Sequence, residues 1–164
     1  MELNVASARA LERLGGSRAE VSTTFLADLA DRCRVVDTNP QALVDAARDW
    51  WPISVRWALA GQVPARPAAV VRPTTVAEVA AVVRLCNEAG VPVTAAGGRS
   101  GVCGGAVPVC GGIALDLLGL SGVLQVDPIS GLIDAAAGTW GNELEDEVRG
   151  NYGLTIGHWP QSME

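Results

Sequence analysis

The sequence predicts an α+β fold built from a strand–helix–strand unit, a glycine-rich loop and a β-hairpin. Residues 68–71 (AAVV) and 91–95 (VPVTA) are short apolar runs with the length of buried strands, and a helical pattern separates them. Directly after the second run, residues 95–105 (AAGGRSGVCGG) contain five glycines. A chain of 164 residues with 49% hydrophobic content is long enough to form one substantial core.

The first sixty residues are expected to be helical and peripheral. FLADLADRC (25–33) and PQALVDAARDWW (40–51) both place apolar residues at three- and four-residue steps, and Pro52 is expected to end the second helix. QVPARP (62–67) predicts an extended linker, because each proline excludes helical backbone from the residue before it. These patterns divide the chain into an N-terminal helical segment, 1–61, and a second portion, 62–164.

The helix between the first two strands has clear start and stop signals. Thr75 and Glu78 have the spacing of a capping box, in which the hydroxyl and the carboxylate each accept from a free amide at the helix start. Gly90 is expected to end the helix, because glycine adopts the left-handed backbone that follows a last helical turn. The residues expected on its buried face are Val76, Val79, Ala80, Val83 and Cys86.

Further elements are expected beyond the glycine loop. GGIALDL (111–117) predicts a third strand, and VLQVD (123–127) with LIDAAAG (132–138) predicts a hairpin around the turn PISG. Thr139 is expected to cap a short helix that ends near Gly150, and LTIG (154–157) is a last strand candidate. The apolar face of that helix would consist of Trp140, Leu144 and Val148.

Composition excludes several classes of function. A net charge of −6 argues against nucleic-acid binding, which uses clusters of basic residues. The N-terminus has no apolar core of a signal peptide, and the most apolar stretch (111–124) is too short to span a membrane and contains Asp116. We therefore expect a soluble cytoplasmic protein. The four cysteines form no CxxC pair and His158 is the only histidine, so we expect free thiols and no zinc site.

The glycine loop at 95–105 is the main candidate site. A phosphate-binding P-loop needs a lysine after its glycines, and this chain has none. A Rossmann fingerprint needs GxGxxG at the start of a helix, whereas Val107-Pro108 and a strand follow this loop. Two interpretations remain: a nest of backbone amides around an anion, with a hydroxyl from Ser100, or a connecting loop without a ligand. Arg99 would contribute a charge to the nest or point to solvent.

The same residues resemble a known family. The pattern P-x-x-V-x-x-P at 67–73, a helix with Glu-Val near its start, and P-V-x-x-x-G-G-x-[ST] at 92–100 are similar to the flavin domain of the vanillyl-alcohol oxidase / p-cresol methylhydroxylase superfamily. The G-H-x-P-x-S stretch at 157–162 and DWWP at 49–52 resemble its alkyldihydroxyacetonephosphate synthase / D-2-hydroxyacid dehydrogenase branch. The resemblance covers residues 35–164 and implies the first α/β subdomain of a PCMH-type FAD-binding fold with the beginning of the second.

This resemblance implies FAD as the cofactor and assigns its binding residues. The first group would wrap the FAD pyrophosphate, and the second would begin a further FAD-contacting segment. Arg99 stands where the family commonly has a third glycine, and Gly101 stands where serine is common, so the hydroxyl role falls to Ser100 alone. The first group is Ala95, Ala96, Gly97, Gly98, Arg99, Ser100, Gly101, Gly104 and Gly105, and the second is Gln161, Ser162, Met163 and Glu164.

The resemblance also implies a reaction. The chain would be part of a flavin-dependent oxidoreductase that transfers a hydride from the CH–OH group of a hydroxyacid-like substrate to FAD. The alternatives are an ether-lipid synthase-like fragment without net redox, and a binding or assembly piece without catalysis. Because the family continues beyond the position of Glu164, we expect an N-terminal fragment with an incomplete FAD-binding domain at 62–164. Such a fragment alone would bind FAD weakly or not at all and would turn over no substrate.

Two further residues, Cys103 and His158, each have a functional and a simpler structural interpretation. Cys103 lies near the position where some members of the superfamily carry a histidine joined to the flavin, but a small buried residue behind the loop is the simpler expectation. His158 has the chemistry for acid–base work, although a packing or hydrogen-bonding role is simpler. Asp116 and Asp127 are expected to anchor loops. Glu143, Glu145, Asp146 and Glu147 are expected to form a solvated helix face. No catalytic residue and no metal ligand is assigned.

Overall fold

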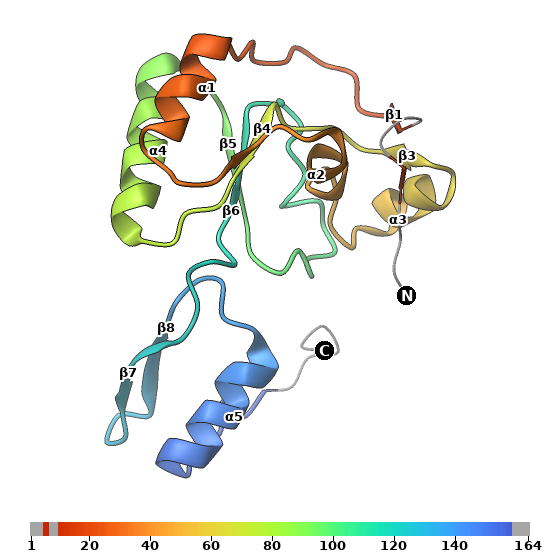
Figure 1. The fold of residues 1–164 in the computed structure, drawn as a ribbon. Helices are drawn as coiled ribbons and strands as arrows, with labels where there is room; N and C mark the ends of the chain where they lie inside the picture. Colours follow the sequence, from red (N-terminus) through yellow and green to blue (C-terminus); the bar gives the residue numbers. More distant parts are fainter. Residues whose placement is uncertain (1–4, 7–9, 159–164) are drawn as a thin grey trace.

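The computed structural model describes residues 5–6 and 10–158. Its centre is a four-stranded sheet in the order β2 (Val36–Asp37), β4 (Ala69–Val71), β6 (Ile113–Asp116) and β5 (Val93–Ala96). Strands β4, β5 and β6 are parallel, and β2 pairs antiparallel with β4, with Val36 opposite Val71. The three parallel strands are those that the sequence predicts. Since β6 lies between β4 and β5, the predicted strand–helix–strand unit crosses over one strand (Figure 1).

Helices cover both faces of this sheet. Helices α1 (Thr23–Ala30) and α4 (Val76–Ala89) lie side by side on one face, and α2 (Pro40–Asp45) lies on the other (Figure 1). On the first face Leu29 of α1 and Val82 of α4 pack into one cluster with Val71 and Ile113 of the sheet. On the second face Ala46, just after α2, packs against residues of β4 and β6. Neighbouring residues of a strand therefore enter opposite cores, which explains why these short strands are apolar throughout.

Helix α4 has the predicted ends but a different buried face. The Glu78 amide donates to Thr75 Oγ1 at 3.1 Å, and Gly90 ends the helix in the left-handed conformation at φ 65°. The Glu78 carboxylate departs from the expected box, since it accepts from the Thr74 amide at 2.6 Å and from the Arg34 amide at 3.3 Å. The predicted face is wrong in part: Val82 and Cys86 are buried, whereas Val76 and Val83 are exposed. The helix is apolar on several sides, so periodicity alone did not define the face.

The N-terminal part contains more elements than predicted. Helix α2 ends at Asp45, before residue 51, and Pro52 begins a further helix, α3 (Pro52–Leu59), instead of only ending one. Proline is well suited to a first helical position, because the amide it lacks would have no partner there. The short strands β1 (Leu11–Glu12) and β3 (Gln62–Val63) pair in parallel. In the described residues, the longest helix is α4 with 14 residues, and no helix has the length and apolar character needed to cross a bilayer.

A smaller unit follows the central sheet. Strands β7 (Val123–Asp127) and β8 (Leu132–Ala135) form the predicted antiparallel hairpin, and helix α5 (Gly141–Tyr152) lies beside it (Figure 1). The backbone at Gly138 approaches the end of the sheet so closely that a Cβ there would lie 2.0 Å from the Leu117 carbonyl oxygen. Glycine is therefore required at this junction.

Three expectations about this unit are wrong. Thr139 does not cap α5: its hydroxyl donates to the Ala136 carbonyl at 2.7 Å and accepts from the Gly122 amide at 3.0 Å, which ties the hairpin to the helix start. Trp140 is the N-cap residue and makes no side-chain cap bond. The helix continues past Gly150 to a left-handed Gly153, and residues 154–157 form no strand.

Candidate functional site

The glycine loop leaves the sheet at the carboxyl ends of its parallel strands. Residues 97–112 run from the end of β5 to the start of β6. Two charged residues mark the same edge: Arg72 follows β4 and Asp116 ends β6, with Arg72 Nε 3.4 Å from Asp116 Oδ2. Arg72 also pairs with Asp37 of β2 at 3.1 Å. In open sheets with parallel strands, ligands bind outside the carboxyl ends of the strands, so the loop lies at the edge where a binding site is expected.

Three of the five loop glycines are explained by contacts within the chain. A Cβ on Gly98 would lie 2.8 Å from the Trp140 ring, and one on Gly97 would lie 3.2 Å from the Ala137 carbonyl oxygen. Gly104 has φ 81°, and a Cβ there would lie 3.3 Å from the Trp51 ring. The hairpin unit thus packs on one part of the loop and the residues before α3 on another. For these three positions, the interpretation as a bare connecting loop is sufficient.

Gly101 and Gly105 are not explained in this way. Neither has positive φ, nothing lies within 4 Å of a Cβ on Gly105, and a Cβ on Gly101 would meet only Asp49 Oδ2 at 3.8 Å. Both glycines are exposed. A glycine that neither packing nor backbone geometry requires lowers stability relative to alanine. Gly15 is equally open and has no positive φ, so an open glycine alone does not identify a ligand site; at Gly101 and Gly105 a ligand has room to approach the backbone.

Arg99 turns away from solvent. It is the one described non-glycine residue with positive φ, at 55°, and its Nη1 donates to the Ala46 carbonyl oxygen at 3.3 Å. Burial lowers the pKa of the guanidinium, while the negative charges of Asp116 and Asp49 act in the opposite direction. The αL backbone at this position is the conformation that a glycine would adopt most easily. Arg99 thus keeps a glycine-like backbone and uses its side chain to fasten the loop to the end of α2.

The residues between α2 and α3 form a wall behind the loop. The Trp50 amide donates to the Gly101 carbonyl at 3.0 Å, and Asp49 Oδ1 accepts from the Trp51 amide at 3.0 Å. Trp51 packs edge-on against Trp57 with ring centroids 5.9 Å apart. The DWWP stretch therefore supports the loop from behind, a role that sequence reasoning missed because no local pattern links residue 49 to residue 101.

The remaining predicted residues occupy different places. Ala95 and Ala96 belong to β5, and the buried Ala96 accepts at its carbonyl from the Leu117 amide at 2.8 Å. Ser100 is exposed on the loop. Gln161, Ser162, Met163 and Glu164 lie outside the described residues. The structure therefore brings together residues 97–105 and leaves the second predicted segment without a description.

A second polar cluster connects α5 to the residues after it. A pocket of about 250 Å³ is lined by Glu145, Arg149, Thr155, Gly157 and His158. The prediction of a solvated acidic face is wrong for Glu145, which is 3% exposed. Its carboxylate accepts from Thr155 Oγ1 at 2.7 Å and from the Ile156 amide at 2.9 Å, and it pairs with Arg149. Hydrogen bonds from Thr155 and Ile156, followed by Arg149, hold the pKa of Glu145 below its ordinary value. His158 is exposed at this pocket.

The cysteines give no sign of a metal site. All four are free; Cys33 and Cys86 are buried, and Cys103 and Cys110 are exposed. The expectation that Cys103 is a small buried residue behind the loop is therefore wrong. Among the described residues, no group of three or more metal-binding side chains comes together.

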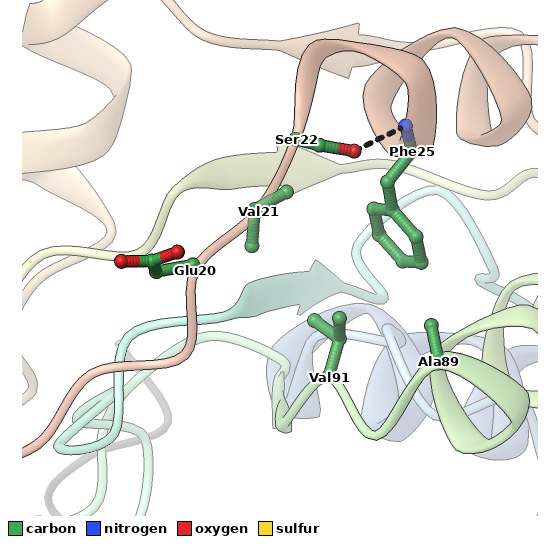
Figure 2. A pocket seen from close by; sticks show the side chains of 6 residues that line it. All are labelled: Glu20, Val21, Ser22, Phe25, Ala89 and Val91. Atoms are coloured by element: carbon green, nitrogen blue, oxygen red, sulfur yellow. Dashed lines mark hydrogen bonds between the residues drawn. The ribbon is translucent and has the colours of Figure 1, made fainter.

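A larger pocket lies away from the glycine loop. It has a volume of about 590 Å³ and is lined by Glu20, Val21, Ser22, Phe25, Ala89 and Val91. Figure 2 shows Ser22 bonded to the Phe25 amide above Val91 and Ala89. Val91 precedes β5, so this pocket lies at the amino end of that strand, whereas the loop lies at its carboxyl end.

Comparison with known proteins identifies the family. Residues 67–164 match the family described as "FAD binding domain". The chain belongs to this family of FAD-binding domains. The match covers the glycine loop, so FAD is the cofactor that this domain binds, in agreement with the expectation from the sequence.

Individual relatives agree with this assignment. The domain is 40% identical over 84 residues to D-lactate dehydrogenase of Anaerostipes hadrus, which covers 51% of this chain and 18% of the relative. It is 32% identical over 127 residues to mitochondrial D-2-hydroxyglutarate dehydrogenase of Bos taurus, which covers 77% of this chain and 22% of the relative. The chain thus spans about a fifth of the length of these relatives.

Solved structures confirm the PCMH-type fold. An alkyldihydroxyacetonephosphate synthase superposes with a TM-score of 0.80 at 23% identity. The superposition covers 95% of this chain and 31% of the synthase chain. p-Cresol methylhydroxylase superposes with a TM-score of 0.66 at 22% identity. That superposition covers 82% of this chain and 26% of the hydroxylase chain. At these identities the similarity shows the fold alone.

Proposed function

We propose that this chain is the FAD-binding portion of a flavin-dependent oxidoreductase that acts on a hydroxyacid-like substrate. The observation that carries the proposal is the FAD-binding family match over residues 67–164, which contain the glycine loop, and the open Cβ positions of Gly101 and Gly105 leave room for a ligand at its backbone. We assign the FAD pyrophosphate to the loop from Ala95 to Gly101 with Gly104 and Gly105. Backbone amides would bind the anion there, and Ser100 would add a hydroxyl donor. Gln161 to Glu164 would begin a second FAD-contacting segment, and the portion 62–164 would be the FAD-binding unit behind the helical segment 1–61.

The substrate class is inferred from the relatives. The names D-lactate dehydrogenase and D-2-hydroxyglutarate dehydrogenase both describe oxidation of a D-2-hydroxyacid. FAD, when bound, supplies the acceptor for the hydride that leaves the substrate's CH–OH carbon. The residues described here would hold and orient the cofactor, and none of them is assigned to the substrate.

An ether-lipid reaction without net redox is the alternative within the same cofactor class. The superposition on an alkyldihydroxyacetonephosphate synthase favours it only at the level of fold, since 23% identity does not transfer an activity. A binding or assembly role without catalysis has less support, because the named relatives are dehydrogenases. The oxidoreductase is therefore the preferred function.

Anaerobic flavin reduction tests the proposal. The complete gene product that contains these residues is purified and its absorbance recorded before and after addition of D-lactate or D-2-hydroxyglutarate. We expect bound FAD and bleaching of its absorption band by one of the two. A protein without flavin would contradict the FAD site. Bound flavin that neither hydroxyacid reduces would contradict the substrate class and leave the ether-lipid alternative.

A cytoplasmic location is part of the proposal. Its support is the four free cysteines, which are typical of a reducing compartment. Cell fractionation followed by immunoblotting tests it, and recovery in the periplasmic or membrane fraction would contradict it.

A further inference from the structure

Asp49 has one carboxylate oxygen without a partner. The residue is 1% exposed, and Oδ1 accepts from the Trp51 amide at 3.0 Å. Oδ2 is buried and has no hydrogen-bond partner among the described residues. A buried carboxylate oxygen without a donor is costly, because nothing replaces the water that it loses on burial. The structure therefore calls for a donor at this atom.

Arg99 does not supply that donor. Arg99 is close enough for its charge to interact with Asp49, but its Nη1 donates to the Ala46 carbonyl oxygen. The ion pairs of the described residues include none between Arg99 and Asp49. The positive charge of Arg99 thus partly offsets the cost of burying the Asp49 carboxylate, but Arg99 donates no hydrogen bond to Oδ2.

The unpartnered oxygen faces the glycine loop. Oδ2 lies 3.8 Å from the position that a Cβ would take on Gly101, and the Trp50–Gly101 hydrogen bond of 3.0 Å holds the two segments together. A methyl group on residue 101 would fill the space next to Oδ2 without a clash. Glycine leaves that space open.

The chemistry of this space selects a neutral donor. A carboxylate repels a phosphate, so Oδ2 does not suit the pyrophosphate itself. FAD carries hydroxyl groups on both sides of its pyrophosphate, on the ribityl chain and on the ribose. We propose that Asp49 accepts a hydrogen bond from one of these hydroxyls of FAD bound at the glycine loop, through the gap that Gly101 leaves. This inference rests on the proposed FAD site and adds a cofactor-binding residue that lies outside the family match at 67–164.

An affinity cycle tests the contact. The complete gene product, freed of flavin, is titrated with FAD and with deoxy analogues that each lack one ribityl or ribose hydroxyl. One analogue should bind the unmodified protein about 10- to 100-fold more weakly than FAD, as expected for a lost hydrogen bond to a charged group. Asp49→Ala should bind FAD and that analogue equally. The inference is overturned if every analogue loses the same factor in both proteins. Absence of FAD binding by the unmodified protein would overturn the FAD site itself, so the two failures are distinguishable.

A stability measurement separates cofactor binding from a purely structural role. Asp49→Asn keeps an oxygen for the Trp51 amide and removes the buried charge. Without FAD, its melting temperature should equal or exceed that of the unmodified protein, while its affinity for FAD falls. If a donor from elsewhere in the protein already satisfies Oδ2, the substitution lowers the melting temperature and leaves FAD affinity unchanged. That result would also overturn the inference.

Discussion

At the scale of single residues, Arg99 shows how a departure from a motif is accommodated. Its φ of 55° lies in the left-handed region that glycine adopts most easily, and its side chain reaches the Ala46 carbonyl oxygen at 3.3 Å. An L-residue in the αL region costs about 1 kcal/mol or more relative to its normal conformation. The hydrogen bond to the end of α2 offsets this cost and fixes the loop.

The first prediction compares two substitutions of Arg99. Both Arg99→Gly and Arg99→Ala lose the hydrogen bond to Ala46, but only alanine keeps a Cβ in the αL backbone. We therefore expect Arg99→Gly to be more stable than Arg99→Ala by about 1 kcal/mol in urea unfolding, the reverse of the usual order of these residues. Equal stability, or a more stable alanine variant, would show that residue 99 does not adopt this backbone.

At the scale of elements, Glu145 joins α5 to the segment that follows it. Its carboxylate accepts from Thr155 Oγ1 and the Ile156 amide and pairs with Arg149. These donors prefer the ionised carboxylate, which places the pKa of Glu145 in the folded protein below its ordinary value of 4.5. The contact therefore stabilises the fold fully above pH 4.5 and is lost as the pH falls through the lower folded-state pKa.

The second prediction follows from that sign. Lowering the pH below 4.5 should shift the Ile156 amide resonance in NMR spectra and reduce the protection of this amide from hydrogen exchange relative to the intrinsic rate at the same pH, because protonated Glu145 accepts less strongly. In Glu145→Gln this titration should be absent. An identical titration in the variant would assign the pH dependence to another group.

At the scale of the whole molecule, local patterns predicted the centre and long-range pairings defined the rest. Strands β4, β5 and β6, the ends of α4 and the hairpin follow from apolar runs and turn residues nearby in the sequence. The two-residue strands β1, β2 and β3 exist only through partners far along the chain, so no local signal marks them.

The candidate site divides in the same way. The motif predicted the loop, but it did not separate the glycines explained by Trp140 and Trp51 from Gly101 and Gly105. Asp49 and Glu145 resemble ordinary surface carboxylates in the sequence. The folded structure shows that both are buried, Asp49 behind the glycine loop and Glu145 under the segment that follows its own helix.

Titration of Gly105→Ala with FAD tests the central claim, that this loop binds the cofactor through an open backbone. The complete gene product, freed of flavin, is compared with this variant and with Gly15→Ala, a glycine that also has nothing within 4 Å of its Cβ position and no positive φ. Both variants should melt at or slightly above the temperature of the unmodified protein. Gly105→Ala alone should lose FAD affinity, by about tenfold or more, because its methyl occupies the approach to the backbone. Equal FAD affinity in all three proteins would contradict the account.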